Sequence, residues 1–126
     1  MTGPKTADGT AELDQLPPDI ATMVATADRL LALDAKPIGA DDLDTLRLTL
    51  RGQIELMIPL VEQQAGRFPK GDVSRECALA CTREAQTRLG LGVGGNSPVR
   101  MSVAMKLARS VVALCHHYQS LGGTPS

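Results

Sequence analysis

Apolar residues recur at intervals of three and four positions in four stretches of this chain, the spacing of one face of an α-helix. The last and longest stretch begins at Ser97-Pro98 and ends at Gly122-Gly123, pairs typical of a helix start and a helix stop. Its apolar arc is broad and comprises Met101, Val103, Ala104, Met105, Leu107, Ala108, Val111, Val112, Leu114, Cys115 and Tyr118. The polar strip that remains holds Lys106, Arg109, Ser110 and His117. We therefore expect this helix to contact several neighbours at the centre of the fold.

Three earlier stretches predict three more helices, so that helices are expected at residues 18–34, 41–66, 72–90 and 97–121. Asp41 is the expected N-cap of the second helix, and either Asp72 or Ser74 that of the third. The first two helices each carry one apolar stripe, formed by Ile20, Met23, Val24, Ala27, Leu30 and Leu31 and by Leu43, Leu46, Leu50, Ile54, Met57 and Val61.

Pro59 lies inside the second expected helix and predicts a kink or a break there. Proline lacks the amide that would bond the carbonyl oxygen of Glu55, and its ring presses on that turn. The bend either wraps the helix around the core or opens a ligand cavity, and the first is the commoner role of such a proline.

Small residues dominate the inner face expected for the third helix: Val73, Cys77, Ala78, Ala80, Cys81 and Ala85. A stripe of small side chains lets two helix backbones approach closely. Ala104, Ala108 and Cys115 offer a matching surface on the last helix, so we expect these two helices to pair.

Together these patterns predict an all-α fold, an antiparallel four-helix bundle-like domain over residues 18–122. Residues 1–17 lack periodicity and are expected to be a disordered leader, and residues 123–126 a disordered tail. Strand signals are weak, because β-branched and aromatic residues do not alternate in runs.

Composition narrows the classes of partner. The formal net charge is −1 and the aromatic residues are Phe68 and Tyr118, so the chain lacks the basic field and the stacking platforms that nucleic-acid binding uses. No apolar run approaches the ~20 residues needed to cross a bilayer, which predicts no membrane partner and a cytoplasmic protein. Three cysteines without scaffold spacing fit reduced thiols in that compartment.

The cysteines carry the strongest candidate chemistry. Cys77 and Cys81 lie one helical turn apart and, with Cys115 and His116, supply the residue types of a tetrahedral zinc site. The last two point in different directions from one helix, and no tight-loop Cys pair accompanies them. Packing of the three thiols as small apolar side chains is the favoured interpretation, and no metal or cofactor is predicted.

Other chemical signals are weaker. His116 and His117 are candidates for a general acid or base, but no nucleophile or paired carboxylate pattern accompanies them, so no catalytic residue is assigned. The glycines of residues 90–95 follow a helix rather than a strand, which favours a flexible connection over a phosphate-binding loop. Four arginines interleaved with Glu76 and Glu84 predict a solvated mixed-charge face, namely Arg75, Arg83, Arg88 and Arg100.

Two leucines of the second helix, Leu48 and Leu56, fall outside its apolar stripe and mark a candidate interaction surface. The leading functional hypothesis is therefore a non-enzymatic module that self-associates or binds a protein partner. The alternative is a helical bundle that binds a ligand or metal among Cys77, Cys81, Cys115 and Tyr118.

Three segments of the chain resemble a known family. The first is Cys77-Ala-Leu-Ala-Cys81, followed by Glu84-Ala85 and Arg88-Leu89, and the second is Leu107-Ala-Arg-Ser110, followed by Leu114-Cys115 and His117-Tyr118. The third is Leu50-Arg-Gly-Gln-Ile54. Over residues 20–122 the chain resembles a family of small all-helical actinobacterial (Streptomyces-type) proteins of unknown function, filed under natural product biosynthesis. The resemblance implies an antiparallel helical domain in a bacterial cytosol. It assigns no catalytic residue.

Overall fold

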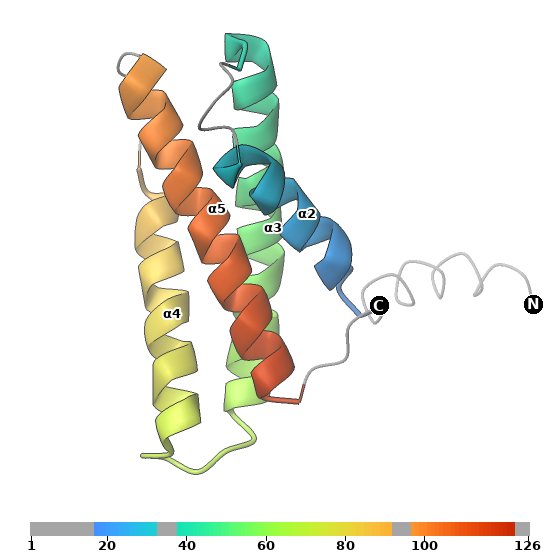
Figure 1. The fold of residues 1–126 in the computed structure, drawn as a ribbon. Helices are drawn as coiled ribbons and strands as arrows, with labels where there is room; N and C mark the ends of the chain where they lie inside the picture. The colour runs from blue at the N-terminus through green and yellow to red at the C-terminus, as the bar shows by residue number, and fades with distance from the viewer. Residues whose placement is uncertain (1–16, 33–37, 92–96, 123–126) are drawn as a thin grey trace, which may run out of the picture.

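The structure, a computed structural model, describes residues 17–32, 38–91 and 97–122. These residues form four α-helices and no strand: α2 (Ile20–Leu31), α3 (Ala40–Ala65), α4 (Val73–Leu89) and α5 (Ser97–Ser120), shown in Figure 1. The all-α expectation is confirmed, and the helix bounds agree with the predicted ranges to within three residues. Apart from Pro17, the expected leader and tail lie outside the described residues, as do residues 92–96 of the glycine-rich connection.

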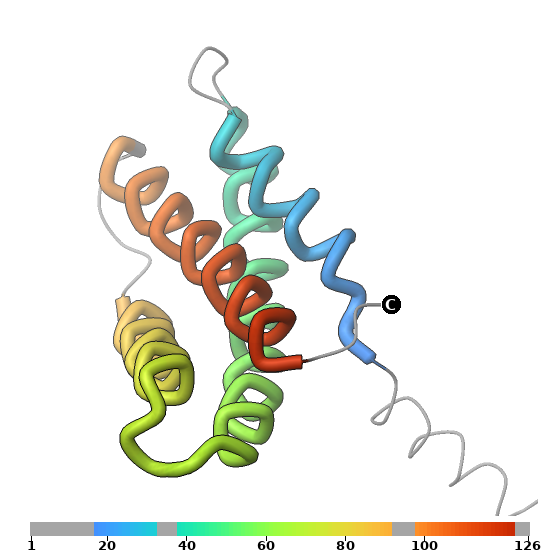
Figure 2. The backbone as a smooth tube through the Cα atoms, turned by 60° about the horizontal axis from the view of Figure 1, so that its bottom comes forward, coloured from blue at the N-terminus to red at the C-terminus, as the bar shows by residue number. Residues whose placement is uncertain are grey.

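Successive helices run in opposite directions, so α3 and α5 run the same way (Figures 1 and 2). These two pack directly against each other, and each also contacts both α2 and α4. Within the described residues α2 and α4 do not touch, because they lie on opposite sides of the α3–α5 pair. The last helix is therefore central, as predicted, but it shares that position with α3.

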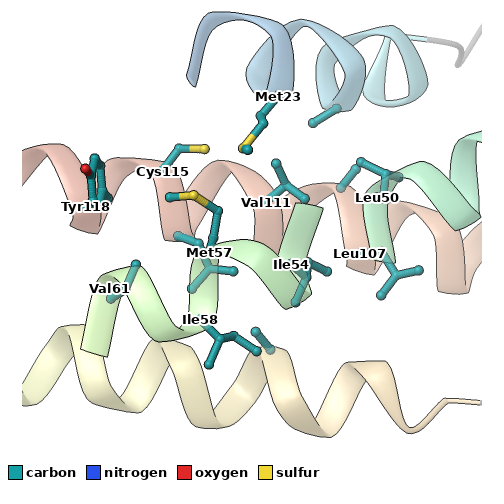
Figure 3. Packing of buried hydrophobic residues seen from close by; sticks show 14 of the residues in the cluster. Met23, Leu50, Ile54, Met57, Ile58, Val61, Leu107, Val111, Cys115 and Tyr118 are labelled. Carbon is teal, nitrogen blue, oxygen red and sulfur yellow. The ribbon is translucent and has the colours of Figure 1, made fainter. Parts of the chain in front are cut away.

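The core consists of aliphatic and sulfur-containing side chains from all four helices. Its largest fully buried members are Leu30, Leu50, Ile54, Met57, Val61, Leu107, Val111, Leu114 and Cys115. Figure 3 shows Met23 of α2 and Met57 of α3 beside Cys115 of α5, and Ile58 between α3 and α4. Burial of each such side chain contributes roughly 1.5–3 kcal/mol, so this shared core holds the bundle together.

Some helix ends of the described residues follow the local capping chemistry predicted, and one does not. Asp72 caps α4, as one of the two alternatives proposed, because its Oδ1 accepts a bond from the Arg75 amide at 3.0 Å. Gly122 stops the last helix at φ +97°, a left-handed conformation that favours glycine. The prediction that Asp41 caps the second helix is wrong: Gly39 is the N-cap, and Asp41 lies inside the first turn, where its charge suits the helix dipole.

Pro59 does not break the second helix. α3 continues from Ala40 to Ala65 as one helix of 26 residues, and the proline ring lies on its exposed side. Of the two expected outcomes, a kink or a break, the break is excluded, and the uninterrupted helix agrees with the single range 41–66 predicted for it.

The inner face of α4 differs from the predicted stripe. Ala78, Thr82 and Ala85 are buried, whereas Val73, Cys77 and Ala80 are exposed. Thr82 tolerates burial because its hydroxyl donates to the Leu79 carbonyl at 2.8 Å and leaves its methyl group for packing. The helices α4 and α5 do pair, but through a face rotated from the one predicted, and α4 contacts α3 as well.

Arginines join the helices rather than forming only a solvated face. Arg88 of α4 donates to the Lys106 carbonyl and to the Ser110 hydroxyl of α5, each at 3.0 Å. Ser110, expected on the polar strip, is consequently buried. Arg75 donates to the Phe68 carbonyl, and Arg100 pairs with Asp44 across α5 and α3. The expectation of a solvated face is wrong for these three half-buried arginines, while Arg83 is exposed.

Candidate functional site

The candidate interaction surface lies on the outer side of α3. Leu48 and Leu56 keep 59% and 50% of their surface exposed, as the sequence suggested. Gly52 lies midway between them, and residues four apart on a helix share one face. The other sides of α3 pack against α2, α4 and α5, so this face is the part of the helix left to solvent.

The neighbours of these leucines present little polarity. The Thr45 and Thr49 hydroxyls donate to the carbonyls of Asp41 and Thr45, at 3.0 and 2.9 Å. With their hydroxyls bonded to their own helix, both threonines leave their methyl groups as outward packing surface. Pro59 adds an exposed ring one turn beyond Leu56. We call this surface the outer α3 face, and it comprises Thr45, Leu48, Thr49, Gly52, Leu56 and Pro59.

Two charged side chains near this face, Arg51 and Asp44, are directed toward other helices. Arg51 reaches α4 and donates to the Leu89 carbonyl at 2.6 Å, and Asp44 pairs with Arg100 of α5. Glu55 lies at the edge of the face. Gly52 adds no side chain at the centre of the outer α3 face, and the exposed Glu55 carboxylate borders it on one side.

The three cysteines do not form one site. Cys77 is exposed, Cys81 half-buried and Cys115 buried, and the Cys115 side chain points toward Met23 rather than toward α4 (Figure 3). Among the described residues, no group of three or more His, Cys, Asp or Glu side chains is placed to hold a metal ion. The prediction that the cysteines pack as small apolar side chains therefore fits Cys115, but it does not hold for the exposed Cys77.

Burial also sets the ionisation of the thiols. Removal from water raises the pKa of Cys115 to about 11, because the thiolate loses its hydration. Burial, with the nearby Glu84 carboxylate, also raises the pKa of Cys81. Neither thiol has the lowered pKa of an activated nucleophile.

We expect the native protein to react with a thiol reagent in a fixed order. Exposed Cys77 should react first, half-buried Cys81 more slowly, and Cys115 only after denaturant is added. Absorbance of the released thiolate reports the rates, and the Cys77→Ser and Cys81→Ser variants should each remove one phase. Three equal rates in the folded protein would contradict this placement.

The two histidines lie near the end of α5. Their rings meet edge to face with centroids 5.6 Å apart. Partial burial and the charge of His116 lower the pKa of His117. His116 is exposed, and the metal role proposed for it with the three cysteines receives no support from this geometry.

Comparisons with known proteins identify a family without assigning an activity. The model of a family described as "Family of unknown function (DUF6415)" matches residues 21–123, most of the chain. No curated protein and no solved structure matches with significance. In the described part of the chain, no helix has the length and apolar character to span a membrane. The resemblance to a family of unknown function is thus confirmed, and the chain belongs to the DUF6415 family.

Proposed function

We propose that this protein is a non-enzymatic interaction module whose binding surface is the outer α3 face. The observation that carries the proposal is the alignment of two half-exposed leucines, Leu48 and Leu56, on either side of a helical glycine. Single exposed leucines are ordinary on protein surfaces, but two that share one helix face form the beginning of an apolar patch of the kind that marks interaction surfaces.

The geometry of α3 supports this role. Its 26 residues are held on three sides by other helices, so the outer face has a fixed shape before any partner arrives. A preorganised surface loses less conformational entropy on binding.

The setting is also part of the proposal. The resemblance stated above associates the chain with natural product biosynthesis in actinobacteria, where a module of this kind acts as an accessory protein in the cytoplasm. The net charge of −1 favours a protein partner over nucleic acid or an anionic membrane.

The test is affinity capture of the full chain from its native cells, with mass measurement of the intact complexes. The double variant Leu48→Lys/Leu56→Lys places two charges on the face and should remove the partner, which is either another protein or a second copy. The control is Val73→Lys, because Val73 is 75% exposed but lies on α4, outside the face.

Helical content measured by circular dichroism must match between the variants and the wild type. A complex lost in the double variant and kept in Val73→Lys supports the proposal. Identical complexes in all three proteins, or a wild-type chain that elutes alone, would contradict it.

A further inference from the structure

We infer that Cys77 and Cys81 form a binding site for a single Cu(I) ion, held between their two sulfur atoms. The site lies on α4, so the inference goes beyond the proposed function, which concerns the outer α3 face. Three features of the described residues carry it: the position of both thiols on one side of α4, the distance between them, and their access to solvent.

The two thiols lie on the same side of α4. Residues four apart on a helix share one face, and Cys81 follows Cys77 by about one turn. Glu84 and Arg88 continue this side toward the end of the helix, where they pair with each other. Arg88 also bonds the Ser110 hydroxyl of α5. The two sulfurs therefore lie along the side of α4 that borders α5.

The separation of the pair suits a bridging ion better than a disulfide. Cβ atoms four residues apart on a helix are roughly 5–6 Å from each other. A disulfide needs its Cβ atoms within about 3.5–4.5 Å, and both thiols are free in the structure. An ion between the sulfurs replaces one sulfur–sulfur bond of about 2 Å with two metal–sulfur bonds of about 2.3 Å. The bridge then fits an undistorted helix.

Access to solvent distinguishes this pair from the third cysteine. Cys77 is exposed and Cys81 half-buried, whereas Cys115 is buried and points toward Met23 of α2 (Figure 3). Cys81 packs against the core, which restricts its side chain and leaves Cys77 to adjust to the ion. Cysteine is among the residue types most often buried, so packing gives no reason for an exposed Cys77.

The number of ligands identifies the ion. Thiolates favour soft metals, chiefly Cu(I), zinc and iron–sulfur clusters. Structural zinc takes four ligands and iron–sulfur clusters are usually held by four cysteines. Within the described ranges, no group of three or more His, Cys, Asp or Glu side chains is placed to hold a metal. Two sulfurs in line satisfy Cu(I), so the pair suits this ion rather than the zinc considered from the sequence.

Binding exchanges protons for the ion without a change of oxidation state. Each thiol releases its proton to solvent and forms one copper–sulfur bond, and the copper remains Cu(I). The resulting complex carries one negative charge. The Arg88 guanidinium lies near enough to favour the Cys81 thiolate, although burial and the Glu84 carboxylate together raise the pKa of that thiol.

Competition with the coloured Cu(I) complex of bicinchoninate, without oxygen, tests the site. The reduced full chain should remove one Cu(I) per molecule from the chelator. Loss of an outer-shell partner typically costs 10–100-fold in metal affinity, so losing one of only two ligands in Cys77→Ser or Cys81→Ser should cost about a hundredfold or more. Cys115→Ala should keep the wild-type affinity, because that thiol is buried elsewhere.

The matched control keeps two accessible thiols on α4 but separates them. Cys81→Ser/Gln86→Cys places the second thiol at an exposed position, nine residues after Cys77 and about 13 Å further along the helix. It should bind Cu(I) as weakly as Cys81→Ser. Circular dichroism must show equal helical content in all the variants.

Two outcomes would overturn the inference. One is a control variant that binds Cu(I) as tightly as the wild type, which would show that any two thiols suffice. The other is X-ray absorption at the copper edge with three or more sulfur neighbours, or a complex with the mass of two chains, because copper would then lie between molecules. Two sulfur neighbours in a monomeric complex support the site.

Discussion

Replacing Leu50 with alanine is expected to lower the free energy of unfolding by about 3 to 5 kcal/mol. Leu50 has no exposed surface and lies in the core that α3 and α5 share, so its removal leaves a cavity as well as losing apolar burial. Domains of this size have a total stability of roughly 5–15 kcal/mol, so the variant should approach the limit of folding. Urea unfolding followed by circular dichroism measures the loss.

Leu48→Ala is the matched control for this prediction. It removes the same atoms two positions away on the same helix, but Leu48 is 59% exposed, so its truncation loses little apolar burial. The expected change is within about 0.5 kcal/mol. If both variants lost the same free energy of unfolding, the placement of Leu50 on the buried side of α3 and Leu48 on its exposed side would be contradicted.

The second large effect is a loss of stability in alkaline solution caused by Cys115. The pKa of its thiol is about 11 in the folded protein and 9.0 in the absence of burial. Between these values the unfolded chain has released the proton while the folded chain keeps it, so rising pH favours unfolding. The stabilisation is complete below pH 9 and falls by about 3 kcal/mol up to pH 11, at 1.36 kcal/mol per unit.

Urea unfolding at a series of pH values from 7 to 11 measures this dependence. Cys115→Ala removes the thiol and should have a shallower alkaline slope than the wild type, although it is less stable at neutral pH because it leaves a small cavity. Exposed Cys77→Ser should keep the wild-type slope. Tyr118 and the lysines are common to all three proteins, so a difference between slopes reports on Cys115. Parallel slopes for the wild type and Cys115→Ala would show that this thiol is not buried as described.

Helix positions were predictable because they depend on local information. The spacing of apolar residues, the carboxylate of Asp72 and the left-handed glycine at Gly122 act within a few residues of each helix end. The faces of α3 and α5 were predictable too, because large aliphatic residues distinguish their buried side clearly. Leu48 and Leu56 were identified as surface candidates for the same reason, since they depart from the stripe of α3.

The face of α4 was not predictable in the same way. Most side chains of α4 are small, and burying an alanine, cysteine, threonine or serine changes the free energy by similar amounts. The sequence pattern of α4 therefore does not show that Thr82 is buried and Cys77 exposed. Similarly, Ser110 is buried because Arg88 reaches across from another helix and bonds its hydroxyl, a contact between residues far apart in the chain. The zinc hypothesis depended on these same uncertain orientations.

The sequence by itself determined four helices, their ends to within three residues, and the aliphatic stripes that must leave water. Only the tertiary structure decided that α3 and α5 pack in parallel at the centre, that α2 and α4 stay apart, and that no atom of the chain approaches Gly52. The physical reason is that helix formation and burial respond to spacing along the chain, whereas the rotation and pairing of helices depend on how all their surfaces fit together at once.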